Sequence, residues 1–188
     1  MSRIIVDSIR NSSASSDGIT LSSDGKVAFP NTSTGKILQV KHAFKNDAWS
    51  ASSPSNWSQI TGLSVTITAA STSNKLLFVC NLMYGQGTQA VFCARLYDGT
   101  NEITASRSTV SSTANYNGWI SDYMRDSSAS GFLSNASGSY LHTPTDTNSH
   151  TYNIYARAVD GGAIYVNRRG SDSSFGGTSS FYVYEVAA

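Results

Sequence analysis

Residues 58–70, SQITGLSVTITAA, and residues 75–84, KLLFVCNLMY, decide the fold. In the first stretch, Leu63, Val65 and Ile67 alternate with serine and threonine. This period of two is typical of a strand with one buried face. The second stretch is apolar at both parities, which predicts a strand in the middle of a sheet. The two stretches therefore predict an antiparallel sheet.

Further strands are expected on both sides of this pair. Residues 36–45, KILQVKHAFK, alternate between a polar and an apolar row, so they predict another half-buried strand. The remaining expected strands cover residues 90–97, 117–125, 149–158, 162–168 and 179–187. No stretch shows an apolar period of 3.6 over three turns, so little helix is expected. About eight strands predict an all-β fold, an antiparallel jelly-roll-like β-sandwich, with a barrel as the alternative.

The first 35 residues are expected to form an extended β arm that precedes a head domain over residues 36–188. Two units of this arm open with Asp-Gly, at 17–18 and 24–25, and Asp-Gly is a turn signal. The arm has too few large apolar residues for its own core, and lone hairpins are marginal in water. We therefore expect it to pair with other chains, as an attachment or trimerisation arm. The residues expected to make this attachment are Ile4, Ile5, Val6, Ile9, Ile19, Leu21, Val27 and Phe29.

The composition argues against two classes of partner. Charged residues make up 13% of the 188 residues and the formal net charge is +1, so the chain has no long-range field to attract nucleic acid or an anionic membrane. The longest apolar run, residues 76–80, is too short for a membrane span. The N-terminus also lacks the apolar core of a signal peptide. We expect synthesis in a cytoplasm, no nucleic acid and no membrane insertion.

The sequence indicates no reaction chemistry. It contains no Gly-x-Ser-x-Gly elbow, phosphate-binding glycine loop or recognisable acid pair. We therefore expect neither an enzyme nor a cofactor. The histidines His42, His142 and His150 lack partners at the spacing of metal ligands, so no metal is expected. A site that His142, Asp146 and His150 build from separate loops is the disfavoured alternative.

Whether the two cysteines, Cys80 and Cys93, can form a disulfide depends on how the strands within residues 75–97 pair. A hairpin turn at residues 85–87, Gly-Gln-Gly, places Cys80 opposite Cys93 and Arg95 opposite Phe78. A disulfide between cross-strand neighbours is strained and a cytoplasm is reducing, so buried thiols are favoured over a bond. An arginine in an apolar ladder needs an acid or a carbonyl partner, from its own chain or from a neighbouring subunit.

Aromatic residues give two candidate contact surfaces. Residues 104–148 are rich in Ser, Thr, Asn and Gly, with isolated rings, and such loops suit recognition. The rings expected to contact a host surface are Tyr116, Trp119, Tyr123 and Tyr140. The plainer alternative, that these rings cap the ends of the sandwich, is favoured. The strand at 179–187 has aromatic rings at both parities, which predicts either a central strand or contact with another subunit.

Two motifs resemble those of a known class of protein. Residues 61–67, TGLSVTI, and residues 71–75, STSNK, together with the arm, resemble the tail-fibre and virion fibre proteins of bacteriophages, marine phages and cyanophages in particular. The C-terminal half fits as well, with Thr151-Tyr152 opening a long hairpin that residues 166–168 close. The body is also similar to the trimeric jelly-roll heads of the tumour-necrosis-factor kind, at the level of fold alone.

The resemblance implies a homotrimeric structural component of a virion, made in the host cytoplasm. Its arm is expected to bind other virion proteins, and its head to face a host-surface polysaccharide or protein. One alternative is a capsid decoration or head-fibre protein that stabilises the shell. Another is a polysaccharide depolymerase, which the small size and the missing acid pair argue against.

Overall fold

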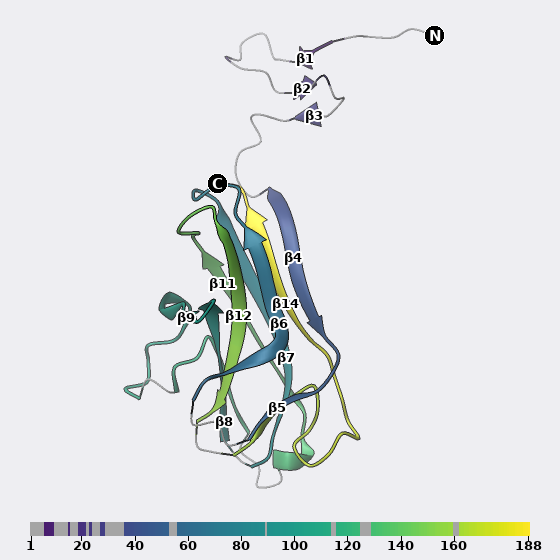
Figure 1. Ribbon diagram of the computed structural model, residues 1–188, viewed down its shortest axis with the longest axis vertical. Helices are drawn as coiled ribbons and strands as arrows, with labels where there is room; N and C mark the ends of the chain where they lie inside the picture. Colours follow the sequence, from purple (N-terminus) through teal and green to yellow (C-terminus); the bar gives the residue numbers. More distant parts are fainter. Residues whose placement is uncertain are drawn as a thin grey trace.

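The computed structural model describes residues 6–9, 15, 19–21, 23, 27–28, 36–52, 56–88, 90–113, 116–124, 129–159 and 162–188. The head strands are β4 (Ile37–Lys45), β5 (Trp49–Ala51), β6 (Ser58–Thr68), β7 (Lys75–Gln86), β8 (Ala90–Asp98), β9 (Asn101–Glu102), β10 (Ile120–Met124), β11 (Ser134–His142), β12 (Ser149–Ala158), β13 (Ile164–Val166) and β14 (Ser179–Val186). The short 3₁₀ segments are η1 (Thr104–Ser106) and η3 (Ala129–Gly131). The all-β expectation is confirmed (Figure 1).

The head strands form two antiparallel sheets. The six-stranded sheet has the order β4-β14-β7-β13-β5, with β11 paired to β7, and the five-stranded sheet has the order β10-β8-β12-β6, with β9 paired to β8. We number the eight strands of five or more residues along the chain. In the six-stranded sheet, the order of neighbouring strands is then first, eighth, third, sixth. In the five-stranded sheet it is fifth, fourth, seventh, second. This is the strand order of a jelly roll, so the expected sandwich is confirmed.

The core lies between the two sheets. The alternating residues Leu63, Val65 and Ile67 of β6 are all buried, as the sequence predicts. Phe78 of β7 is fully buried, and its ring centroid lies 4.7 Å from that of Tyr152 on the opposite sheet. β7 pairs on both of its edges, so its prediction as a central strand is also confirmed.

The predicted hairpin between β7 and β8 is wrong, because the two strands lie in different sheets. Cys80 pairs with Phe181 of β14, and Cys93 pairs with Ser121 of β10. The glycines serve another purpose: a Cβ at Gly85 would lie 2.6 Å from the backbone oxygen of Arg168. They let the 168–170 segment approach β7 closely, and the chain crosses to the other sheet after residue 87. Both cysteines belong to the described residues, and they form no disulfide.

The same error affects two other expectations. Arg95 does not face Phe78; it pairs with Tyr155 of β12. Its Nη1 lies 2.9 Å from Glu102 Oε2, and its Nε donates to the Asn117 carbonyl at 2.9 Å. The arginine therefore finds both an acid and a carbonyl inside its own chain. The long hairpin expected to open at 151–152 and close at 166–168 is also absent, since β12 and β13 lie in different sheets.

Strand β11 lies inside the region expected to consist of polar loops. Its sequence, SNASGSYLH, places Ala136, Gly138 and Tyr140 on the inner side, which gives too weak an apolar alternation to predict a strand. Gly138 is required there, because a Cβ would lie 2.7 Å from Ile120 Cγ1 of the opposite sheet. Residues 104–148 therefore contribute an edge of the six-stranded sheet as well as loops.

Strand β4 has the reverse of the burial expected for a half-buried strand. Gln39, Ala43 and Lys45 point toward β6, whereas Val40 and Phe44 point away from the sandwich and are 46% and 57% exposed. The apolar row of this alternating strand thus faces outward.

Polar contacts at the inner row of β4 explain the reversal. Gln39 Nε2 donates to Thr68 O at 2.8 Å and to Glu185 Oε2 at 2.6 Å. Glu185 is fully buried, and its Oε1 also accepts hydrogen bonds from Ala70 N and Asn74 Nδ2. Burial raises the pKa of the Glu185 carboxyl, but the hydrogen bonds from Gln39, Asn74 and the backbone outweigh it, and its pKa lies below the usual value. The inner polar residues are satisfied by these bonds, which fixes the register of β4.

The described part of the arm forms its own three-stranded antiparallel sheet, β1 (Ser8–Ile9), β2 (Ile19–Leu21) and β3 (Val27–Ala28) (Figure 1). The sequence predicts pairing with other chains, whereas these strands pair with one another. The expected attachment residues Ile9, Ile19, Leu21 and Val27 lie on these strands, and Val6 precedes them. Ile9 and Val27 remain more than half exposed. Ile4, Ile5 and Phe29 lie outside the described residues, and attachment stays a prediction.

Candidate functional site on the outer sheet face

The outward side of the six-stranded sheet, here called the outer face, is the candidate functional site. The strand register aligns its residues into three rows that cross the sheet from β4 through β14 and β7 to β11. From the end where β4 starts, the rows are Val40–Tyr184–Leu77–Leu141, His42–Tyr182–Val79–Ser139 and Phe44–Ser180–Asn81–Ser137. The first row is entirely apolar apart from one phenol hydroxyl.

The rings of the outer face are stacked in order. His42 lies 5.6 Å from Tyr182 with the rings 19° apart, and Tyr182 lies 6.0 Å from Tyr184 with the rings 18° apart. Together with exposed Val40 and Leu141, they form a continuous apolar and aromatic band. Bands of this kind mark contact surfaces on proteins, because burying them in a partner removes apolar area from water.

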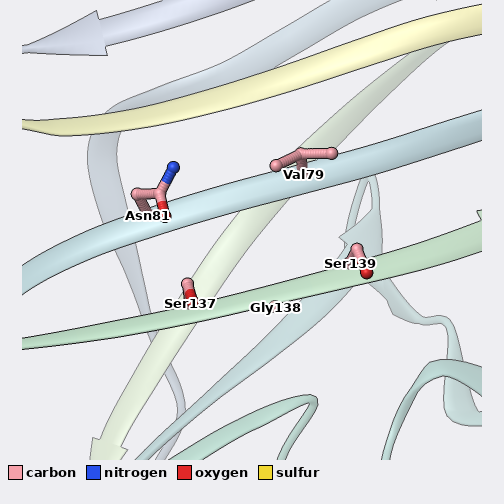
Figure 2. Close-up of a pocket in the computed structure, with 5 residues that line it drawn as sticks. All are labelled: Val79, Asn81, Ser137, Gly138 and Ser139. Atoms are coloured by element: carbon pink, nitrogen blue, oxygen red, sulfur yellow. The ribbon is translucent and has the colours of Figure 1, made fainter.

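A hollow of about 350 Å³ lies beside this band, between β7 and β11. Its lining combines the Val79 methyl groups, the Asn81 amide and the hydroxyls of Ser137 and Ser139, with Gly138 at its floor (Figure 2). The hollow exists because the outward residues of β11 are small here. The outer face is therefore raised at Phe44 on β4 and sunken at Ser137 and Ser139 on β11.

The outward side of the other sheet carries polar residues on β6 and β12 and an aromatic pair further across, where the rings of Tyr97 and Tyr155 lie 4.1 Å apart. Thr66 and Thr151 share a hydrogen bond of 2.8 Å across the strands. Asn153 accepts from Ser64 Oγ at 2.6 Å and from Gln59 Nε2 at 3.0 Å. Hydroxyl and amide side chains of this kind are suited to water.

Charged groups gather at the end of the sandwich where β4 starts. His150 Nδ1 lies 2.6 Å from Asp98 Oδ2, and His150 Nε2 lies 2.9 Å from Asp146 Oδ1. Hydrogen bonding to Asp146, supported by Asp98, raises the pKa of His150, while the same bond lowers the pKa of Asp146. Burial lowers the pKa of the nearby His142. His150 can donate to both carboxylates only as the imidazolium.

This cluster predicts a pH dependence of stability. Because the pKa of His150 is higher in the folded than in the unfolded chain, its contribution is complete below about pH 6.5 and is lost as the pH rises through the raised value. We expect the melting temperature to fall as the pH rises from about 6 to about 9, and His150→Gln to flatten that fall. Differential scanning calorimetry of the natural protein and of His150→Gln measures the melting temperature over this pH range. Equal slopes of melting temperature against pH in the two proteins contradict the assignment. Since His142 responds with the opposite sign, the difference between the two curves isolates His150.

The expected combination of His142, Asp146 and His150 is brought together only in part. His150 contacts Asp146, but its second partner is Asp98, which lies 52 residues away and has no sequence signal that links it to His150. Of the residues that the structure describes, no group of three His, Cys, Asp or Glu side chains could hold a metal ion. Within the same residues, no helix has the length and apolar character needed to cross a bilayer.

The four rings expected to contact a host surface lie in three different settings. Tyr116 is part of the loop that covers β8, and its carbonyl lies 3.7 Å from Cys93 Sγ. Tyr123 is exposed on β10. Trp119 and Tyr140 are partly buried against the core, and Trp119 Nε1 donates to Ser139 O at 3.1 Å. The four rings come from different parts of the fold, and host contact stays a prediction.

Comparisons with known proteins add little. No known protein family and no curated protein matches the sequence. One similar solved structure is titled "Structure of infectious bursal disease virus Gx strain". It is 14% identical, covers 81% of this chain and 37% of that chain, and has a TM-score of 0.34. The chain thus spans little more than a third of that protein, and a similarity this weak carries no argument about function.

Proposed function

We propose that this chain is a structural subunit of a virion, a homotrimeric tail fibre or fibre-like appendage whose arm attaches it to other virion proteins. The single observation that supports self-assembly is the reversed strand β4. A solitary jelly roll gains stability by turning the apolar row of an alternating strand inward. Here Val40 and Phe44 face outward beside Tyr182 and Tyr184, which favours a partner surface on that side.

The virion assignment rests on the resemblance of the arm and of residues 61–67 and 71–75 to bacteriophage fibre proteins. The polar residues on the outward side of β6 and β12, such as Thr66 and Thr151, suit a surface that stays in water. The proposal assigns no reaction to the chain.

The mass of the purified protein tests the assembly. Light scattering is expected to give three times the 20.0 kDa of one chain, and a mass that stays at one chain at all concentrations refutes the proposal. Labelling particles with an antibody against the head then tests the location, since tail labelling supports a fibre and shell labelling supports decoration instead.

A further inference from the structure

The outer face is uneven, with large and small side chains at different places along each row. At the level of Phe44, the row continues through Ser180 and Asn81 to Ser137, so one large side chain stands at the β4 edge and small ones lie beyond it. At the level of His42, the row likewise ends in Ser139. A protruding edge and a hollow therefore lie on opposite sides of one face, at the same positions along the strands.

The attachment arm restricts how copies can be arranged. Every arm joins the head at Lys36, directly before β4. Subunits that anchor together need their arms at the same end, which a symmetry axis along the strands provides. A two-fold axis perpendicular to the outer face would send the arms in opposite directions. Rotation about an axis along the strands also keeps each row at its own level, so protrusion and hollow meet.

We propose that the β4 edge of one copy inserts into the β7–β11 hollow of the next copy, in a head-to-tail contact that closes as a ring. This inference deepens the proposed function and rests on it. The two contacting surfaces differ, so the interface is heterologous, and heterologous interfaces close into rings when the rotation permits. The partner is a second copy of this chain, since one face carries both halves of the contact.

The chemistry of the two surfaces fits this arrangement. Phe44, 57% exposed, supplies apolar area that can pack on the Val79 methyl groups and over the floor at Gly138. The imidazole of His42 meets the hydroxyl of Ser139 and can hydrogen-bond to it. The neighbouring row, from Val40 to Leu141, brings aliphatic side chains together on both sides. The Ser139 hydroxyl therefore keeps a hydrogen-bond partner when water is expelled.

Cysteine cross-linking tests the contact in the full chain. The double variant Phe44→Cys/Ser137→Cys is expected to form a closed covalent trimer under a mild oxidant, visible on a non-reducing gel. Each single variant is expected to form no intermolecular disulfide, because a head-to-tail contact never places two copies of one residue together. The natural Cys80 and Cys93 are fully buried and do not interfere. Cross-linking by Phe44→Cys alone would show a two-fold contact and overturn the proposal.

A second pair and a matched control make the outcome decisive. His42→Cys/Ser139→Cys repeats the test one row away, in case the first variant is poorly folded. Phe44→Cys/Leu141→Cys is expected to remain uncrosslinked, because Leu141 lies four residues, about 13 Å, beyond Ser137 on β11, and a disulfide needs Cα atoms about 4–7 Å apart. A trimeric natural chain with no cross-link in either test pair overturns this inference alone. A monomeric natural chain overturns the proposed function as well.

Discussion

Replacing Val40 with aspartate is expected to convert the proposed assembly into monomers. Val40 is 46% exposed on the single chain, and its row continues with Tyr184, Leu77 and Leu141. In a closed assembly, the introduced carboxylate is buried in apolar surroundings without a partner. An uncompensated buried charge costs about 3–5 kcal/mol, so each contact is expected to weaken more than about a hundredfold.

Light scattering over a range of concentrations measures the loss of assembly, and circular dichroism checks that the head remains folded. Thr66→Asp is the matched control, because Thr66 lies on the outward side of the other sheet, where it is exposed and bonded to Thr151. It introduces the same charge and is expected to leave the mass unchanged. If Val40→Asp keeps the mass of the natural protein, the outer face is not the assembly surface.

The largest loss of stability is expected from Phe78→Ala. Phe78 is fully buried and contacts rings from both sheets, Tyr152 at 4.7 Å and Phe181 at 6.0 Å between centroids. Removing a buried phenylalanine side chain costs about 3–5 kcal/mol, because packing is lost and a cavity remains. For a chain of this size, the melting temperature is expected to fall by about 10 °C.

Thermal unfolding followed by circular dichroism measures this effect, at one protein concentration, because assembly also stabilises the folded state. Phe175→Ala is the matched control, since Phe175 is 60% exposed. Its melting temperature is expected to stay close to that of the natural protein. Equal shifts in the two variants contradict the assignment of Phe78 to the centre of the core.

The strands could be predicted wherever alternation was strong. Residues 58–70 and 75–84 have β-branched and apolar residues at regular spacing, and the strands form where this spacing places them. Strand β11 could not be predicted, because its inward residues include a glycine and an alanine. The partner of β7 could not be predicted either, since Gly85 allows both a tight turn and the close approach of another segment. Sequence alone does not distinguish these two uses of glycine.

Part of the outer face could be predicted from the sequence. Alternation in residues 36–45 predicts two rows, and rings at both parities of residues 179–187 predict a central strand or a subunit contact. Which row of β4 faces inward depends on Gln39 and Glu185, residues 146 positions apart whose side chains hydrogen-bond. No local pattern encodes such a contact. The hollow likewise arises only when β11 is placed beside β7.

Strand β4 ends the sheet order, and a free edge can recruit further strands without limit. Here its inward row carries Lys41 and Lys45, and Lys45 is held by Asp47 at 2.8 Å. Inward-pointing charges on an edge strand oppose the addition of another backbone, because each added strand would desolvate them. The lysines thus block growth of one continuous sheet and favour contacts through side chains. Copies of the chain at high concentration can then touch without polymerising into amyloid-like filaments.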